Sequence, residues 1–405
     1  LVYNWTAELE RFAPSLDVCA IVGAKAQRRM QISGVAEHSV VVTSYDLMRR
    51  DIDEYVEQDF ARVVLDEAQY IKNPLTQVAR AAKRLPAGVR FALTGTPIEN
   101  RLSELWSIFD FLMPGLLGTR ESFAKRFESP VEHAEGDSAA RLQALVSPFV
   151  LRRVKEDVVA DLPEKIEDTV MAQLTGEQRK LYLANQDRIA QQVQHREAGE
   201  FKKDKLKVLA ELTKLRQICC DPRLHYEDYK AGSAKLDTCM ELVRGALDGG
   251  HRILLFSQFT GMLDIIGKRL AKEDIAFLKL TGASSKESRA KMVAQFQAGE
   301  VPVFLISLKA GGVGLNLTAA DVVIHYDPWW NVAAQDQATD RAHRIGQQHT
   351  VTVYKLIAKD TIEERIMQMQ ESKRDLVNSV LGGDGISSAL FTREDVLALL
   401  GGDGR

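Results

Sequence analysis

Two adjacent carboxylates in the sequence RVVLDEAQYIKN have the type and spacing that nucleotide chemistry needs. An apolar strand is expected to end directly before Asp66 and Glu67, and ligands of open parallel sheets bind outside the carboxyl ends of the strands. Asp66 could hold a magnesium ion through water, while Glu67 orients or deprotonates an attacking water molecule. Two surface acids that begin a helix would look the same, so the pair alone leaves both interpretations open.

A polar turn follows a second expected strand, in the sequence FALTGTPIEN. Thr94, Gly95 and Thr96 precede Pro97 and a helix. Hydroxyls and free backbone amides at such a turn suit a phosphate or a contact that couples two sites. An ordinary connection between a strand and a helix explains the same residues equally well.

A glycine-rich segment follows an apolar strand much later in the chain, in VFLISLKAGGVGLNL. This segment contains Ser307, Lys309, Gly311, Gly312 and Gly314. Glycine lets a backbone approach phosphates closely, and a lysine adds positive charge. The glycine spacing differs from the GxGxxG of a dinucleotide site, and no ribose-binding acid stands out downstream, so the segment does not indicate such a site.

Two arginines in the sequence QATDRAHRIGQ stand three residues apart. We expect Arg341 and Arg344 to lie on one face of a helix. Two forked guanidinium groups that project together would fit a phosphoryl group during its transfer. Surface ion pairs with Asp336 or Asp340 are the alternative interpretation.

The elements that must position these residues form two blocks. From 35 to 112 and from 250 to 357, short β-branched runs alternate with helical stretches, a pattern typical of parallel sheets that are buried on both faces. We therefore expect an α/β protein with two lobes. The expected strands lie in SVVVTSY, ARVVLDEA, VRFALTGTP, RILLFSQF, VPVFLISL, DVVIHYD and TVTVYKLIA.

The remaining regions have a helical pattern. Residues 138–220 contain few strand signals, and the stretch from Glu177 to Arg216 holds ten Lys and Arg against six Asp and Glu. This balance indicates either a solvated helical face or a surface that faces nucleic acid. After Asp360, one long helical pattern runs to a C-cap at Gly382.

Composition limits the class of protein. The 405 residues are 45% apolar and 27% charged, which is typical of a globular protein of two or three domains. No uninterrupted apolar run reaches the roughly 18 residues of a membrane-spanning helix. The four cysteines lack paired CxxC spacing, which argues against zinc and disulfides and favours a reduced, intracellular protein. The net charge of −3 excludes a generally basic surface but allows one local basic track.

The order of these motifs resembles that of the helicase-like superfamily two. More narrowly, it resembles the SWI/SNF-type family of ATPases that translocate on double-stranded DNA, over nearly the whole chain. Asn4–Trp5 with Glu8 is similar to the end of the family's motif Ia. The other strings that carry the resemblance are VVVTSYDLMRRD, LDEAQYIKN, LTGTPIENRLSELWSIFDFLMPGLLG, FVLRRVKEDVVADLPEK, KLRQICCDP, LLFSQF, the glycine-rich segment and DRAHRIGQ.

The resemblance implies two RecA-like parallel-sheet lobes that close on ATP, with helical insertions between them and a C-terminal brace helix. We expect an incomplete first lobe over residues 1–130 and a helical protrusion and linker over 131–232. A second lobe over 233–358 and a brace helix with tail over 359–405 would follow.

The resemblance also implies roles for individual residues. Asp66 would bind Mg²⁺, Glu67 would activate water, and Gln69, where many members have His, would sense the γ-phosphate or couple it to DNA. Arg341 and Arg344 would act as arginine fingers. Residues near the nucleotide would be Gly314, Gln337 and Asp340; residues on the DNA track or the coupling path would be Ser44, Tyr45, Thr94, Gly95, Thr96, Ser307, Lys309, Gly311, Gly312 and Trp329. Trp329 and Trp330 could instead be core aromatics.

The activity implied by the resemblance is ATP hydrolysis coupled to movement on double-stranded DNA and displacement of bound protein, by a monomeric motor that needs no membrane. No GxxxxGK[ST] occurs in the sequence, so we expect the chain to begin inside the first lobe and to be inactive by itself. The alternatives are a non-hydrolysing DNA- or protein-binding fragment and, third, a strand-separating helicase. The motor would be nucleoid-associated in a bacterial cytoplasm or nuclear in a eukaryote.

Overall fold

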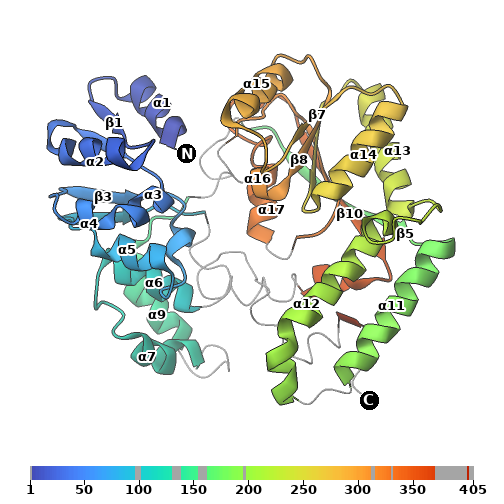
Figure 1. Ribbon diagram of the computed structural model, residues 1–405, viewed down its shortest axis with the longest axis horizontal. Helices are drawn as coiled ribbons and strands as arrows, with labels where there is room; N and C mark the ends of the chain where they lie inside the picture. Colours follow the sequence, from blue (N-terminus) through green and yellow to red (C-terminus); the bar gives the residue numbers. More distant parts are fainter. Residues whose placement is uncertain are drawn as a thin grey trace. The chain divides into compact units, whose positions relative to one another are not determined.

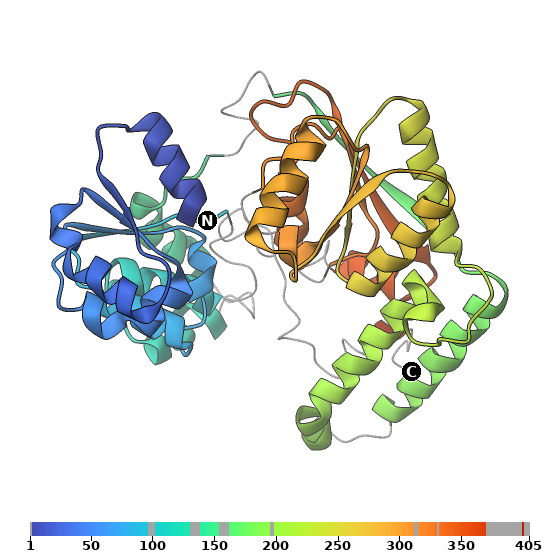
Figure 2. The same ribbon diagram turned by 45° about the horizontal axis from the view of Figure 1, so that its top comes forward.

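The computed structural model describes residues 2–95, 102–129, 138–153, 162–194, 198–311, 315–329, 332–369 and 399–400. The described residues up to Leu151 form one compact unit, and those from Arg152 form a second one. Each unit is described by itself, with the first drawn from blue to teal and the second from green to red in Figures 1 and 2. The finer four-part division expected from the sequence stays a prediction.

The first unit contains two short pairs of parallel strands. β1 (Val18–Ala20) pairs with β2 (Val40–Val42), and β3 (Arg62–Leu65) pairs with β4 (Val89–Ala92). The three strands expected in this block are thus confirmed as β2, β3 and β4. The helical segments are α1 (Val2–Phe12), α2 (Lys25–Ser33), η1 (Val35–Glu37), α3 (Tyr45–Arg50), α4 (Ile52–Tyr55), η2 (Ala68–Ile71), α5 (Gln77–Arg84), α6 (Leu102–Leu112), α7 (Arg120–Phe123), the π-helical η3 (Ala124–Glu128), α9 (Ser138–Val146) and η4 (Ser147–Phe149).

Helix α6 joins two apolar clusters of the first unit. Its Ile108 and Phe111 pack with the strands and with α5, whereas Leu105 and Phe109 pack with α7, η3 and α9. Residues three or four apart share one face of a helix, so the sequence LSELWSIFDFL presents apolar side chains to both sides. This double burial explains why the helix is apolar nearly all round.

The second unit is built on a six-stranded sheet in which every strand pair is parallel, with the order β5-β10-β9-β6-β8-β7. The expected α/β class and the four strands predicted for this block are confirmed. The strands are β5 (Lys165–Gln173), β6 (Ile253–Ser257), β7 (Phe277–Leu280), β8 (Val303–Ser307), β9 (Val322–His325) and β10 (Val351–Lys359).

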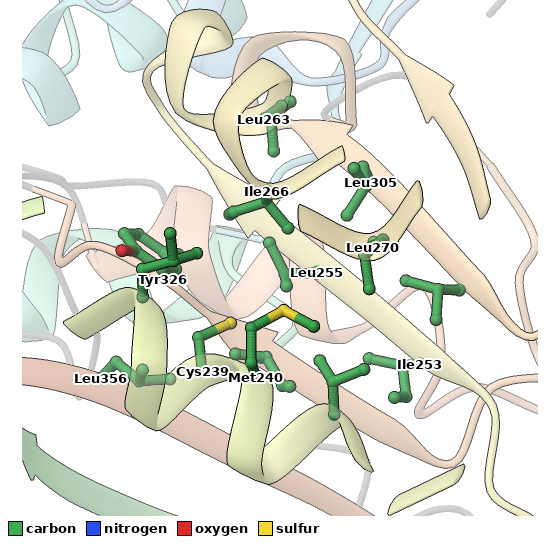
Figure 3. Packing of buried hydrophobic residues seen from close by; sticks show 14 of the residues in the cluster. Cys239, Met240, Ile253, Leu255, Leu263, Ile266, Leu270, Leu305, Tyr326 and Leu356 are labelled. Carbon is green, nitrogen blue, oxygen red and sulfur yellow. The ribbon is translucent and has the colours of Figure 1, made fainter. Parts of the chain in front are cut away.

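Helices cover both faces of this sheet. Ile253 and Leu255 of β6 pack with α13 (Ala234–Asp248) and α14 (Thr260–Lys272), as Figure 3 shows. Leu254 and Phe256 point to the other face and pack with α15 (Lys286–Gln297) and α17 (Val332–Thr339). Successive side chains of a strand point to opposite faces, so a strand between two helical layers must be apolar throughout. The continuous run ILLF meets this requirement.

Strand β5 was not predicted, because its sequence lacks that signal. The strand KIEDTVMAQ pairs with β10 from Lys165–Val351 to Gln173–Lys359, yet most of its side chains are exposed or half-buried. It lies at one edge of the sheet. An edge strand borders one neighbour and can remain polar, so its place in the sheet is visible only in the tertiary structure.

Helices α11 (Gly176–Gln194) and α12 (Ala198–Cys220) pack together below the sheet in Figure 2. The start of the expected C-terminal helix, residues 362–369, is helical and packs against them. It is anchored by a buried ion pair between Lys235 Nζ and Glu363 Oε2 at 2.5 Å. The rest of that expected helix, including Gly382, lies outside the described residues. The remaining helices of the unit are η5 (Pro222–Leu224) and α16 (Leu308–Gly311).

Membrane spans were also sought among these helices. In the part of the chain that the structure describes, no helix is both long enough and apolar enough to cross a membrane.

Candidate active site

The two acids singled out in the sequence lie at the carboxyl ends of β3 and β4. The register pairs Leu65 with Ala92, so the residues that follow both strands leave the sheet at the same edge. The backbone N–H of Ala68 donates to the carbonyl of Leu93 at 2.9 Å and joins the two connections just beyond the strands. This edge is where open parallel sheets bind ligands.

The side chain of Asp66 is held in place by its neighbours. Its Oδ1 accepts from the backbone N–H of Glu67 at 2.9 Å, and its Oδ2 accepts from the indole N–H of Trp5 at 2.8 Å. The Tyr45 hydroxyl donates to the Asp66 carbonyl at 2.8 Å. A carboxylate oxygen has two acceptor positions, so both oxygens can still face a cation or its water shell. Hard cations such as Mg²⁺ prefer oxygen ligands of this kind, and Asp66 therefore fits the expected magnesium ligand.

Glu67 has a backbone conformation that is unusual for a residue with a side chain. Its φ and ψ are both 52°, in the left-handed region. For a residue other than glycine this conformation costs on the order of 1–3 kcal/mol and is found preferentially at functional sites. The surrounding bonds hold it, because Tyr70 N–H also donates to the Glu67 carbonyl at 3.0 Å.

A chain of side-chain hydrogen bonds connects the ends of the two strands. Gln69 Nε2 donates to Glu67 Oε2 at 2.6 Å, and Gln69 Oε1 accepts from the Thr94 hydroxyl at 2.9 Å. An ionised carboxylate can only accept, so the amide nitrogen must face Glu67 and the amide oxygen must face Thr94. The residue after β4 is thereby linked to the acid after β3.

Ser44 and Tyr45 lie next to this network. The Ser44 hydroxyl accepts from Leu47 N–H at 3.4 Å and caps α3, so its described role is structural. The ring of Tyr45 lies 5.1 Å from that of Tyr70. Burial raises the pKa of Tyr45 far above its ordinary value, and the charges of Asp66 and Glu67 add to the effect. Tyr45 therefore stays a neutral hydrogen-bond donor.

The carboxyl edge of the second sheet also collects polar residues. Ser307 ends β8 and pairs with Ser257 at the end of β6. The Ser257 hydroxyl donates to the Asp327 carboxylate, and Gln258 N–H donates to Asp327 Oδ1 at 3.1 Å. Burial raises the pKa of Asp327, an effect that the nearby Arg216 opposes.

Arg216 is a residue of this edge that was not predicted from the sequence. It comes from α12, its side chain is buried, and its guanidinium donates to the Pro328 carbonyl and to Gln258 Oε1, the latter at 3.1 Å. A planar guanidinium can serve several acceptors in fixed directions. The motif KLRQICCDP contained the residue, but its partners lie 42 and 112 positions away along the chain.

The expected helical face shared by the two arginines is wrong. Helix α17 ends at Thr339, and both arginines lie beyond it. Arg341 N–H donates to Ala338 O at 3.2 Å and Ala342 N–H donates to Thr339 O at 3.0 Å. These bonds span three residues rather than four and tighten the chain into a turn. Arg341 is consequently buried and Arg344 exposed.

The other predicted residues divide into described and undescribed ones. Gln337 on α17 and Asp340 just after it are half-buried. Trp329 is half-buried against the apolar cluster of α15 and α17, and its backbone N–H donates to Gln335 Oε1 at 3.4 Å. Gly95 follows Thr94, Lys309 lies within α16, and Gly311 ends that helix. Thr96, Gly312, Gly314 and Trp330 lie outside the described residues.

Two family models match the chain. The SNF2-related domain matches residues 1–224, and the helicase conserved C-terminal domain matches residues 234–346.

Individual proteins are similar over most of the chain. It is 38% identical to an uncharacterized ATP-dependent helicase of Mycoplasma pneumoniae, over 98% of this chain and 38% of that protein. It is 40% identical to a putative ATP-dependent helicase/translocase of Bacillus subtilis, over 96% of this chain and 43% of that protein. The solved Sulfolobus solfataricus SWI2/SNF2 ATPase core in complex with dsDNA has 37% identity and a TM-score of 0.48, covering 94% of this chain and 80% of that one.

The chain thus spans 38% and 43% of the lengths of these two curated relatives. The SNF2-related model alone covers more than half of the 405 residues, and the helicase model begins ten residues after it ends. The order of the motifs and the parallel-sheet architecture agree with both models. The chain belongs to the SNF2-related, helicase-like family.

Proposed function

We propose that this chain is the motor core of an enzyme that couples ATP hydrolysis to movement along double-stranded DNA and to displacement of bound protein. Membership of the SNF2-related family supports ATP use, and the names of its relatives include an ATP-dependent helicase and a helicase/translocase. One structural neighbour is bound to dsDNA. We assign the same class of partner to this chain.

The proposed hydrolytic chemistry belongs to Asp66 and Glu67. Asp66 would hold Mg²⁺, which when bound neutralises phosphate charge. The Glu67 carboxylate would accept a proton from water or orient that water toward the γ-phosphate. Its left-handed backbone and its bond from Gln69 fix the direction of the carboxylate, which is the preorganisation that general-base catalysis needs.

The observation that best supports the proposal is the pair of hydrogen bonds that connects Glu67 through Gln69 to Thr94. It connects the proposed water-activating acid to the residue that follows the neighbouring strand. A change at either end must therefore be felt at the other, because the Gln69 amide serves both partners. We assign Gln69 and Thr94 to the path that couples hydrolysis to DNA, together with Gly95 and Thr96.

The second unit would supply the remaining groups. We assign Arg341 and Arg344 to the stabilisation of charge on the transferring phosphoryl group, a role that suits a planar guanidinium. Gly314, Gln337 and Asp340 would lie near the nucleotide. The proposed DNA track or coupling path includes Ser44, Tyr45, Ser307, Lys309, Gly311, Gly312 and Trp329.

The test uses the full-length protein. Phosphate release is measured without DNA, with single-stranded DNA and with duplex DNA, and movement is measured as ATP-dependent displacement of a third strand from a triplex. We expect stimulation by duplex DNA and triplex displacement by a monomer. DNA binding without hydrolysis would favour a non-hydrolysing binding protein, and separation of a plain duplex would favour a strand-separating helicase. Either result would contradict the proposal.

A further inference from the structure

Gln347 lies just beyond the two arginines and is buried, with 6% of its surface exposed. Its Nε2 donates to the carbonyl oxygen of Ala320 at 2.7 Å and to those of Thr318 and Ala342 at 3.1 Å. An amide nitrogen carries two hydrogens, so at least one of them is shared between two carbonyl groups. One side chain thus joins the loop before β9 to the segment that carries the arginines.

The other end of the same amide is also engaged. Gln347 Oε1 accepts from the backbone N–H of Gln348 at 2.8 Å and from that of His349 at 3.0 Å. All partners of the nitrogen are acceptors and all partners of the oxygen are donors. This complementarity fixes the orientation of the amide. Glutamate, which has the same shape, cannot replace Gln347, because one of its carboxylate oxygens would face the three carbonyl oxygens.

The segment held by Gln347 is residues 340–346, the arginine turn. It follows the end of α17 and ends at Gly346, whose φ is 101°. One helical bond, from His343 N–H to Thr339 O at 3.1 Å, continues into this turn. The rest of its shape depends on bonds to its surroundings, which include His343 Nε2 at 2.8 Å from the carbonyl oxygen of Pro163. The carbonyl of Arg341 itself accepts from Leu317 N–H at 2.9 Å, which ties the turn to the same loop that Gln347 holds.

That loop, residues 315–320, directly follows the glycine-rich segment. The loop and the arginine turn are therefore joined at two points, by the Leu317 amide and by the Gln347 side chain. Leu317, Ala320 and Ala342 are fully buried, so water does not replace a lost bond there easily. If one of these bonds were lost, the buried carbonyl group would lack a donor, and this cost would favour a shift of the turn.

We propose that Gln347 is a positioning residue for hydrolysis, which sets the place of Arg341 and Arg344 by fastening the arginine turn to the 315–320 loop. This inference rests on the proposed function, since it presumes that the arginines act on ATP. A misplacement of about 1 Å can lower a rate by roughly 10²-fold. Loss of the Gln347 amide should thus reduce turnover through the position of the arginines.

The chain offers a matched control in Gln297 of α15. Its Nε2 donates to Asn316 O at 3.2 Å and to Thr318 Oγ1 at 3.4 Å, and its Oε1 accepts from Ala319 N–H at 2.9 Å. Gln297 therefore holds the same loop through a comparable set of bonds. It makes none of these bonds to the arginine turn, so Gln297→Ala loosens the loop without releasing the arginines.

The experiment compares Gln347→Ala, Gln347→Glu and Gln297→Ala in the full-length protein with saturating duplex DNA. We expect both Gln347 variants to lower kcat by about 10- to 100-fold while the KM for ATP changes by less than about threefold. Gln297→Ala should keep kcat within about twofold of the unsubstituted protein. An equal loss in Gln297→Ala, or an unchanged kcat in the Gln347 variants, would overturn the proposal.

Amide hydrogen exchange supplies a readout that does not depend on activity. Gln347→Ala should speed exchange at Leu317 and across residues 341–349, whereas Gln297→Ala should speed it at Ala319. Unchanged exchange across 341–349 would also overturn the proposal. If the unsubstituted protein hydrolyses no ATP, the proposed function fails. If Arg344→Lys abolishes turnover and the Gln347 variants do not, only the inference about Gln347 fails.

Discussion

At the scale of single residues, Glu67 differs from the other acids that the structure describes in the first unit, both in its backbone and in its contacts. It has a left-handed conformation, and its carboxylate accepts from Gln69 at 2.6 Å. The acid beside it is held by Trp5 and by the backbone of Glu67 itself. A strained residue whose neighbours hold it in one direction is suited to a reaction that needs one geometry.

We expect Glu67→Gln in the full-length protein to keep ATP binding and to lower turnover by about 10²-fold or more, because general-base catalysis contributes roughly that much. Glutamine keeps the shape and loses the basic oxygen. The measurement is steady-state phosphate release beside nucleotide binding. Glu57→Gln, an exposed acid of the same unit, is the control and should change neither quantity. Unchanged turnover in Glu67→Gln would remove Glu67 from this role.

The two arginines are expected to respond differently to the same substitution. Arg344→Lys should lower turnover by roughly 10³-fold with a smaller effect on nucleotide affinity, since lysine cannot reproduce the planar fork. Arg341→Lys should lower turnover too, and because Arg341 is buried it should also lower the temperature of unfolding. Arg179→Lys, at an exposed position of the same unit, serves as the control. Full turnover in both variants would contradict the arginine-finger assignment.

At the scale of elements, His325 joins β9 to the end of α17. Its Nε2 lies 2.8 Å from Thr339 Oγ1, and its ring stacks on Phe256 with centroids 5.5 Å apart. Burial lowers the pKa of His325 to about 3, and the charge of Lys355 adds to the effect. The ring is therefore neutral in the folded protein. Its partner Thr339 ends α17, directly before the arginine turn.

This lowered pKa predicts how stability depends on pH. Between about pH 6.5 and pH 3, the unfolded chain binds a proton at His325 that the folded protein does not bind. Stability must therefore fall as the pH falls through this window, by up to about 1.4 kcal/mol per pH unit from this one group.

We expect His325→Gln to have a shallower acid dependence than the unsubstituted protein, because glutamine can reach Thr339 but does not titrate. Free energies of unfolding from urea titrations at pH 7, 6 and 5 measure the difference between the two proteins. His349→Gln removes an exposed histidine and should leave the slope as it is. If the free energy of unfolding depends on pH equally in the unsubstituted protein and in His325→Gln, His325 takes up a proton in the folded protein as readily as in the unfolded chain, which would contradict the prediction.

At the scale of the whole molecule, the groups proposed for catalysis are divided between two units. The acids belong to the first unit and the arginines to the second. The acids follow the carboxyl end of β3, at the edge where open parallel sheets bind ligands. The arginines lie between α17 and β10, and their turn is bonded to the segment that enters β9.

We expect a polypeptide of residues 1–405 by itself to hydrolyse ATP slowly, with little stimulation by DNA. The printed sequence contains no GxxxxGK[ST], and in NTPases of this kind the backbone and lysine of that loop hold the phosphates. Phosphate release with and without duplex DNA measures this turnover. Robust stimulated turnover by residues 1–405 that Glu67→Gln abolishes would show that another segment binds the phosphates.

The sequence by itself predicted the α/β class and most strands of the three sheets. Runs such as ILLF and VVIH carry a strong local signal, because a strand covered on both faces must be apolar at every position. The order of the motifs also identified the family. These features depend on residues that are neighbours in the chain, and their pattern can be recognised without knowledge of the fold.

The sequence pattern failed to predict the structure of two segments, because their structure depends on contacts with distant residues. Strand β5 stayed hidden because an edge strand can be polar. The arginine turn looked helical because the spacing of Arg341 and Arg344 fits a helix, whereas bonds from Leu317 and Gln347 hold the segment in another shape.

The tertiary structure alone decided which side chains meet. Trp5 and Asp66 are 61 residues apart, Gln69 and Thr94 are 25 apart, and Arg216 and Pro328 are 112 apart. The type of each residue shows what it can donate or accept, and that much is present in the sequence. Which donor meets which acceptor depends on strand register and helix packing, because only a completed sheet brings the ends of distant strands to one edge.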